Sequence, residues 1–298
     1  MRLVEWIRAS QAILFEASII PALVGTAAAI AAGAPFRAAY LVLILASLVG
    51  IQAGANLLKG YYEGEGRPGP PSLRGSWVGF DSGAAVGLGE APRNVLRAGR
   101  IAFAIGVLAG LVLVVVTSNV VLLAFGIAGA TLAWSYSAPP LKLSYRGIGE
   151  LSTFFAFGPI MTLGATIAFG GRGIEQSLVA SVVLGFLASA ISFVRYFPNQ
   201  KEDRAKGKRT PVTILGLTTA RSLFFGLFVV ALATLGLWTL SGAYRAAYPM
   251  LALVVFTSIL FFVFPNEGAP PRAYERAIAL TITAHIVVGI ALIAQFLL

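Results

Sequence analysis

Apolar runs of about 20 residues recur along the chain, separated by shorter polar segments. They fall near residues 12–32, 39–58, 99–117, 119–137, 151–169, 177–195, 219–240, 247–264 and 277–297. This is the length at which an α-helix crosses the hydrocarbon core of a bilayer, and the period-2 alternation of a membrane β-barrel is missing. The pattern predicts an all-α, polytopic membrane protein with nine transmembrane helices in one domain over residues 1–298.

The composition supports a chain that uses lipid as its solvent. Hydrophobic residues make up 58% of the 298 residues and charged residues only 11%, whereas charged residues are about 25% of a typical soluble domain. The chain has no cysteine and one histidine. Disulfides, thiolate catalysis, cysteine metal sites and histidine metal clusters are therefore excluded.

The basic residues predict the orientation of the helices. If the amino terminus is cytoplasmic, the cytoplasmic segments and their helix ends hold all of the 22 Lys and Arg except Arg37, Arg172 and Arg245. This bias follows the positive-inside rule and predicts a multi-pass protein of the cell membrane. Topology thus explains the net charge of +10 without a nucleic-acid partner. The two longest cytoplasmic loops follow the second and sixth runs, which predicts that the active-site loops lie on the cytoplasmic face.

A first polar cluster ends the second apolar run, in GANLLKGYYEGEGRPG. Asn56 and Glu63 are seven residues apart, which places them on one helix face, and Lys59 lies beside them. Arg67 follows in the same string. A simpler interpretation stays open, in which Asn56 bonds a neighbouring helix and the charges beyond it are solvated.

A second cluster follows the sixth run, in FPNQKEDRAKGKRTPVTILG. Asn199 and Asp203 are four residues apart and share a helix face, while Lys201, Arg204 and Lys208 point elsewhere or follow Gly207. By itself this charge run could be ordinary cytoplasmic loop. A third string at residues 134–165 carries Tyr136, Lys142 and Arg146 after Pro139 and Pro140, and an amphipathic loop is its simpler interpretation.

The combination of clusters indicates a specific chemistry. Amide and carboxylate oxygens without His or Cys suit a hard cation such as Mg2+, which binds one or two carboxylates together with substrate phosphates. The accompanying Lys and Arg suit the phosphate oxygens. We therefore expect a lipid with a diphosphate head and an apolar tail that lies among the helices.

The same strings resemble a known family. The chain resembles the UbiA superfamily of intramembrane aromatic prenyltransferases over essentially its whole length. YRGIGE followed by FGP and LGA, and FPNxxxDxxxGKRTxxxxLG, are similar to the 1,4-dihydroxy-2-naphthoate prenyltransferase branch of menaquinone synthesis. YSAPPLKL is also similar to the chlorophyll synthase and homogentisate branches. The resemblance implies nine helices around a central cavity and Mg2+-dependent transfer of a prenyl group from prenyl diphosphate to an aromatic acceptor such as dihydroxynaphthoate.

The resemblance also implies roles for particular residues. The metal-binding and catalytic positions are Asn56, Glu63, Asn199 and Asp203. The expected substrate-binding positions are the basic and tyrosine residues of the three strings, namely Lys59, Arg67, Tyr136, Lys142, Arg146, Tyr196, Lys201, Arg204 and Lys208. Aromatic side chains that could face an allylic cation are Phe154, Phe155, Phe157, Tyr196 and Phe197.

The chain departs from the family pattern at two acidic positions. Gly60 stands where the first motif has its first Asp, Glu63 replaces the second Asp, and Asn199 replaces the first Asp of the second motif. Two missing charges weaken a dication site unless Glu65, Glu202 or Asp81 compensates. The alternative hypothesis is a divergent, non-catalytic relative that binds an isoprenoid lipid or quinone. A transporter is disfavoured because the polar residues gather at one face of the membrane.

Two ionisable residues lie inside apolar runs. Glu16 is in the first run and either faces a polar cavity or lies near the inner interface. His285 lies deep in the last run, and we interpret it as a hydrogen-bonded packing residue rather than a catalytic one.

Overall fold

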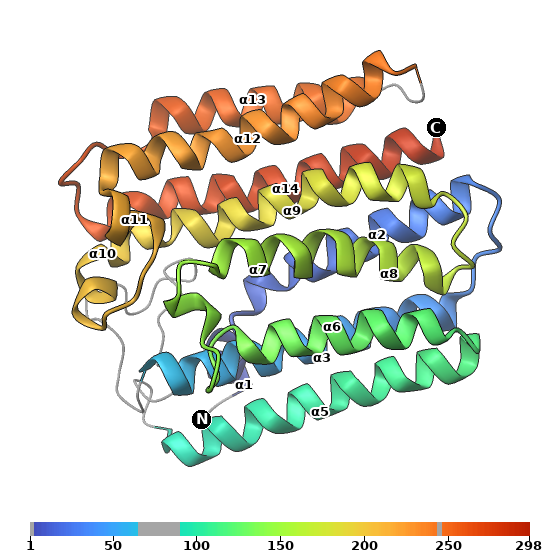
Figure 1. Cartoon of the computed structure of the whole chain (residues 1–298), viewed down its shortest axis with the longest axis horizontal. Helices are drawn as coiled ribbons and strands as arrows, with labels where there is room; N and C mark the ends of the chain where they lie inside the picture. The colour runs from blue at the N-terminus through green and yellow to red at the C-terminus, as the bar shows by residue number, and fades with distance from the viewer. Residues whose placement is uncertain (1–2, 65–89, 243–245) are drawn as a thin grey trace.

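The helices of the molecule run side by side, so that their ends gather at two opposite faces (Figure 1). The computed structural model describes residues 3–64, 90–242 and 246–298, and within those ranges the regular elements are all helical. Seven helical segments are long and apolar enough to cross a membrane, and the two shorter apolar helices Val120–Ser135 and Ala247–Val263 accompany them. Each predicted apolar run is helical and the multi-pass membrane architecture is confirmed, while nine crossings and a cytoplasmic amino terminus stay predictions.

The described elements follow one another along the chain, with residues 65–89 and 243–245 left out of the description. In order they are α1 (Leu3–Ala9), η1 (Ala12–Phe15), α2 (Glu16–Ala31), α3 (Ala38–Gly64), α5 (Pro92–Thr117), α6 (Val120–Ser135), η3 (Leu143–Tyr145), α7 (Gly149–Phe155), η4 (Ala156–Ile160), α8 (Met161–Ala168), α9 (Ile174–Val194), α10 (Tyr196–Ala205), α11 (Pro211–Leu215), α12 (Leu217–Leu240), α13 (Ala247–Val263), η5 (Pro271–Tyr274) and α14 (Glu275–Leu297).

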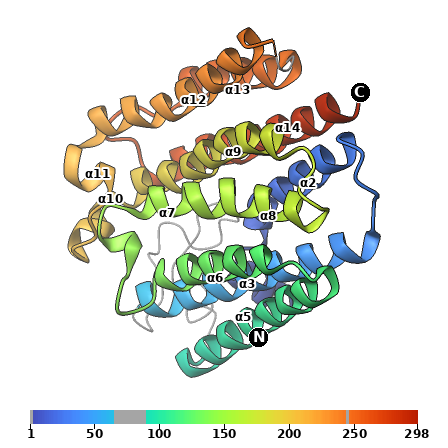
Figure 2. The same cartoon turned by 45° about the vertical axis from the view of Figure 1, so that its right-hand side comes forward.

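The long helices form successive layers from α5 to α13. Helices α3 and α5 pack together, α2 lies between α8 and α14, and α9 packs against α12 (Figures 1 and 2). One buried apolar cluster joins α9, α12, α13 and α14 and includes Leu184, Phe224, Leu260 and Ile278. Short helices α1, α10 and α11 gather at one end of the bundle, so the polar segments predicted to carry the chemistry share one face.

Two of the predicted spans are not regular α-helices. The first begins with the 3-10 turn η1 after Gln11, whose φ of 54° is left-handed. Gln52 of α3 donates to the Leu14 carbonyl at 2.7 Å, and Ser18 donates to Gln52 at 2.6 Å. The fifth contains the π-turn η4 around Pro159, because proline has no N–H to donate to the preceding turn. These breaks were not predicted from the apolar pattern, which does not report backbone hydrogen bonding.

Glycines bring α3 and α5 into direct backbone contact. A Cβ on Gly106 of α5 would lie 2.5 Å from the Ile51 nitrogen and 2.7 Å from the Ser47 oxygen. Because neighbouring apolar helices in lipid gain little from hydrophobic burial, such close contact of small residues is a main source of their association. It fixes α3, which carries the first polar cluster.

We therefore expect Gly106→Leu to destabilise the fold. The added side chain must push α3 and α5 apart, and overpacking of this kind costs about 1–3 kcal/mol. The thermal unfolding midpoint in detergent should fall. Gly226→Leu on α12 is the matched control, because a Cβ there meets nothing within 4 Å. Equal losses in the two variants would contradict the close-packing interpretation.

The two ionisable residues inside apolar runs pair with each other. His285 Nδ1 lies 2.6 Å from Glu16 Oε2, joining α14 to the start of α2. His285 is fully buried. Neither residue lines the cavity described below. The hydrogen bond and burial predicted for His285 are confirmed, while its lack of a catalytic role stays a prediction.

Replacing His285 should destabilise the protein without touching the cavity. His285→Ala leaves the Glu16 carboxylate in an apolar environment without its partner, and breaking a buried pair costs about 3 kcal/mol. A double variant with Glu16→Gln should recover part of this loss, because no charge is then stranded. Thermal unfolding of the two variants measures both effects; a double variant no more stable than His285→Ala alone would argue against the pair.

Candidate active site

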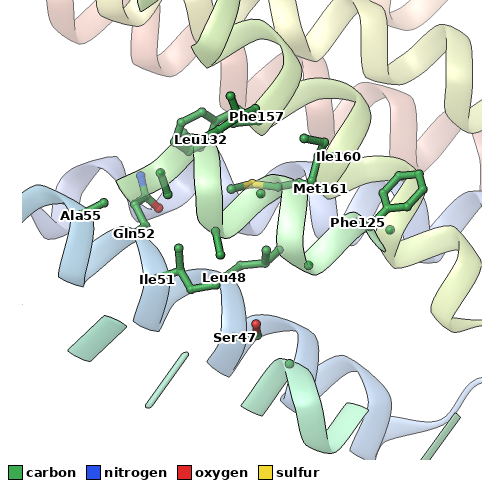
Figure 3. A pocket seen from close by; sticks show the side chains of 18 of the residues that line it. Ser47, Leu48, Ile51, Gln52, Ala55, Phe125, Leu132, Phe157, Ile160 and Met161 are labelled. Atoms are coloured by element: carbon green, nitrogen blue, oxygen red, sulfur yellow. The ribbon is translucent and has the colours of Figure 1, made fainter. Parts of the chain in front are cut away.

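A cavity of about 300 Å3 lies among α2, α3, α5, α6, α7–α8 and α9. Most of its walls are apolar: Leu48 and Ile51 of α3 face it from one side, while Phe157 and Met161 face it from another (Figure 3). Lys59 and Ser47 both line it on α3, and the helical rise of 1.5 Å per residue separates them by roughly 18 Å. The cavity is therefore elongated along the helices, as an acyl or prenyl tail requires.

One end of the cavity is polar and cationic. Asn56, Lys59, Tyr136 and Arg195 line it together. Lys59 and Arg195 are buried, and the Lys59 ammonium lies 5.5 Å from the centre of the Tyr136 ring. Both cations interact electrostatically with Glu63 and Asp203. An anionic group at this end would meet buried cationic side chains, and charges interact more strongly in a buried site than in water.

Glu63 binds a lysine that is remote in sequence. The Lys208 ammonium donates to Glu63 Oε2 at 3.1 Å, and the hydroxyls of Ser137 and Ser144 donate to Glu63 Oε1 at 3.0 and 2.8 Å. Lys206 donates to the Glu63 backbone carbonyl at 3.1 Å. The end of α3 is thus joined both to the loop after α6 and to the loop after α10.

Asp203 lies on the other side of the same lysine. Lys208 Nζ is 3.9 Å from Asp203 Oδ1, so one ammonium is close to both carboxylates. Asp203 Oδ2 is buried and has no hydrogen-bond partner, and a buried polar atom without a partner is costly. The helix ends that carry Glu63 and Asp203 therefore converge in the structure, as the sequence predicted.

Burial and neighbouring charges shift the acid and base properties of this cluster. Burial raises the pKa of Asp203 to about 6 against the opposing effect of Lys208. For Lys208, burial lowers the pKa, but Glu63 and Asp203 outweigh it and leave the pKa above its usual value. Burial raises the pKa of Tyr196 well above its usual value. At neutral pH, Lys208 is a permanent cation and Tyr196 a neutral hydrogen-bonding group.

The two predicted asparagine ligands are held through their amide nitrogens. Asn56 Nδ2 donates to the Ser10 carbonyl and Asn199 Nδ2 to the Arg195 carbonyl, both at 2.9 Å. With each amide nitrogen fixed in this way, each amide oxygen is left to accept or to coordinate. The sequence spacing predicted the shared helix faces but not these backbone partners.

Asp203, Asn56 and Asn199 carry oxygens of the kind that Mg2+ binds. No group of three or more His, Cys, Asp or Glu side chains that could hold a metal occurs in the part of the chain that the structure describes. Asp203 offers a carboxylate oxygen that nothing else uses, and the asparagines offer neutral oxygens. Mg2+ commonly binds one or two carboxylates and completes its coordination with water and phosphate oxygens.

The structure separates the predicted substrate-binding residues into groups. Lys59, Tyr136, Tyr196 and Lys208 belong to the buried cluster or line the cavity. Lys142 is partly buried, 5.4 Å from the Tyr145 ring, which also contacts Lys208. The side chains that face outward are Lys201, Arg204 and Arg146, and the last of these donates to the Pro140 and Leu141 carbonyls. Arg67, Glu65 and Asp81 lie outside the described residues.

Sequence reasoning missed three contributors to the site. Arg195 lines the cavity, and Ser137 and Ser144 hold Glu63. An arginine directly at the end of an apolar run was a usable signal, because burying that charge is expensive unless it has a function. The serines carried none, since their role depends on a contact across more than 70 residues.

Of the aromatic residues considered for cation stabilisation, Phe157 lines the cavity. Phe155 is 45% exposed on the outer surface, and Phe154 packs edge-on against it and at a tilt against Phe186. Phe197 is stacked on Tyr274 in the buried cluster between α9 and α14. Position along a helix, rather than aromatic character, decides which ring faces the cavity.

Comparison with known proteins gives a consistent result. The model of the UbiA prenyltransferase family matches residues 92–293. The chain is 30% identical over 234 residues to 1,4-dihydroxy-2-naphthoate octaprenyltransferase of Mycobacterium tuberculosis, covering 76% of this chain and 75% of that protein. It is 31% identical over 267 residues to the chloroplastic 2-carboxy-1,4-naphthoquinone phytyltransferase of Arabidopsis thaliana, covering 85% of this chain and 62% of that protein.

Solved structures share the fold. A UbiA homolog from Archaeoglobus fulgidus bound to DMAPP and Mg2+ superposes with a TM-score of 0.68 at 15% identity, covering 97% of this chain and 99% of that chain. A UbiA homolog from Aeropyrum pernix K1 gives a TM-score of 0.65 at 14% identity over 93% and 97% of the two chains.

Proposed function

Because the chain belongs to the UbiA prenyltransferase family, we propose that it transfers a prenyl group from a prenyl diphosphate to a naphthoate acceptor such as 1,4-dihydroxy-2-naphthoate. Two relatives carry naphthoate or naphthoquinone acceptors in their names. The observation that carries the proposal is the elongated apolar cavity that ends at the buried cations Lys59 and Arg195. This arrangement matches a substrate with a diphosphate head and an isoprenoid tail.

In the proposed complex the diphosphate lies at the cationic end of the cavity. Lys59 and Arg195 line that end and contact its oxygens, and Tyr136 donates from the same wall. Fixed positive groups lower the barrier because they favour charge that develops on the leaving diphosphate. Mg2+, held by Asp203 with Asn56 and Asn199, would supply further positive charge to the same oxygens.

The apolar walls of the cavity would surround the prenyl group while it carries positive charge. Breaking the carbon–oxygen bond leaves an allylic cation on the prenyl group, and water would quench it. Phe157 faces the cavity and offers its ring to such a cation, and the apolar lining keeps water away. A carbon of the acceptor then forms the new bond and loses its proton.

Turnover by the purified protein tests this function. Reconstituted protein is incubated with geranylgeranyl diphosphate and 1,4-dihydroxy-2-naphthoate, and the prenylated product and released diphosphate are measured with Mg2+ and with a chelator. We expect product only in the presence of acceptor and divalent cation. Tight binding of the prenyl diphosphate without turnover on any naphthoate acceptor would instead favour the non-catalytic relative, since Gly60 and Asn199 have replaced two acids.

We further propose that the site opens toward the cytoplasm of the cell membrane. The basic residues of α10 and its following loop support this orientation under the positive-inside rule. Because the chain has no cysteine, Lys201→Cys and Arg172→Cys, both exposed and at opposite ends of the bundle, each give a single label site. A membrane-impermeant maleimide should label intact cells only at position 172. Labelling only at position 201 would reverse the assignment.

A further inference from the structure

Glu63, which the family pattern identifies as a metal ligand, has its carboxylate already engaged. Three donors reach it: the Lys208 ammonium on one oxygen and the Ser137 and Ser144 hydroxyls on the other. The side chain is 4% exposed and that of Lys208 is 5% exposed. A metal ion on this carboxylate would need to displace a buried ammonium, or stand beside it as a second positive charge.

Lys208 is held in place and is not a mobile surface lysine. Its backbone N–H donates to the Asp203 carbonyl at 2.8 Å, and its own carbonyl accepts from Thr213 at 2.9 Å. The rings of Tyr145 and Tyr196 each lie 5.6 Å from its ammonium. A lysine fixed at both backbone groups and surrounded by rings loses little entropy when it acts as a permanent cation.

Asp203 differs from Glu63 in what its oxygens contact. Its Oδ1 is 3.9 Å from the same ammonium, beyond hydrogen-bonding distance, and its buried Oδ2 has no partner. It is therefore the carboxylate with ligand capacity to spare. The spare amide oxygens of Asn56 and Asn199 are neutral and suit the same role.

The balance of buried charges also favours a single divalent ion at this site. Within the described residues, the buried cations Lys59, Arg195 and Lys208 are already balanced by the buried Glu63 and Asp203 and the partly buried Glu150. One divalent ion adds two positive charges to this site, and the negative charges of a diphosphate can neutralise them. A second would add two more positive charges beside a fixed ammonium, and like charges at short distance in a poorly solvated site repel strongly.

We infer that Lys208 takes the place of a metal ion at Glu63, so that this protein binds a diphosphate with a single divalent cation, coordinated by Asp203. The inference deepens the proposed function and rests on it. It assigns the four predicted ligands to two roles: Asp203, with the asparagines, binds metal, and Glu63 holds the ammonium that replaces a metal.

Counting bound Mn2+ tests the inference without turnover. Full-length protein is dialysed to equilibrium against Mn2+ and inorganic pyrophosphate, and bound metal is measured by the loss of the free Mn2+ signal in electron paramagnetic resonance. We expect one Mn2+ per chain. Two per chain would overturn the inference while leaving prenyl transfer intact, and none would overturn it along with the metal requirement, which the turnover assay measures separately.

Variants distinguish the two carboxylates. Glu63→Gln should still bind one Mn2+ with pyrophosphate, whereas Asp203→Asn should lose it. Lys208→Met should gain a second Mn2+ because Glu63 is released. Lys206→Met should stay at one, because it removes the same charge from a lysine that donates to the Glu63 backbone carbonyl and to Glu202. Loss of Mn2+ in Glu63→Gln, with Asp203→Asn unaffected, would overturn the assignment even if Lys208→Met fails to fold.

Discussion

Asp203→Asn should abolish prenyl transfer and yet stabilise the metal-free protein above about pH 6. The loss of activity follows from the proposed role of Asp203, because the variant removes a buried carboxylate oxygen of the cluster that has no partner. Losing a positioned electrostatic group of this kind lowers kcat by about 100- to 1,000-fold, and loss of the ion itself adds to that.

The gain in stability has an independent cause. Burial raises the pKa of Asp203 from 3.8 to about 6. The positive charges of Lys208 and Lys59 lower this pKa, whereas the negative charges of Glu63 and Glu202 raise it further. In metal-free protein the folded state therefore keeps a proton between about pH 4 and pH 6 that the unfolded chain releases. This bound proton stabilises the folded state fully below about pH 4. Its contribution to the free energy of unfolding is lost as the pH rises to about 6, a loss of at most about 3 kcal/mol.

Thermal unfolding in the presence of a chelator, measured from pH 4 to pH 8, checks this. The difference in midpoint between Asp203→Asn and the native protein should grow in favour of the variant up to about pH 6 and then level off. Glu202→Gln is the control, since Glu202 neighbours Asp203 but is only partly buried and pairs with Lys206 at 2.6 Å. A difference that is constant across this range would contradict the raised pKa.

The buried cluster marks the limit of what the sequence could predict. Helical periodicity placed Asn56 with Glu63, and Asn199 with Asp203, because spacing along one helix is a local property. The ion pair between Glu63 and Lys208 joins positions 145 residues apart, and no local pattern encodes which lysine of KEDRAKGKRT reaches it. The structure selects Lys208, while Lys201 and Arg204 face outward.

The helices themselves were more predictable than their interruptions. Apolar length gives the spans, since lipid requires every backbone group to bond within the helix. At the first of the two interruptions, another helix supplies a hydrogen-bond partner. Gln52 does so for the Leu14 carbonyl, and this depends on a packing contact between η1 and α3 that the pattern of apolar residues does not contain.

Filling the deep end of the cavity should change which prenyl diphosphate the enzyme uses. Gly164 of α8 lines the cavity, and a Cβ there would lie 3.7 Å from the Phe125 ring, in ordinary contact. Gly164→Leu therefore adds bulk without displacing backbone. Lys59, at the cationic end, is unaffected, so short substrates should still bind while long tails meet the new side chain.

The expected result is a shift in specificity, not a loss of activity. For Gly164→Leu, kcat/KM for geranylgeranyl diphosphate should fall by about tenfold or more relative to geranyl diphosphate, since even one methylene in an apolar pocket is worth about 10- to 200-fold. The ratio of the two kcat/KM values is measured by supplying both prenyl diphosphates together and quantifying the two products by mass spectrometry. Gly236→Leu on α12 is the matched control, because its Cβ meets nothing within 4 Å and it lies away from the cavity. An unchanged ratio in Gly164→Leu would mean that the tail leaves the cavity before it reaches α8, and that another surface selects its length.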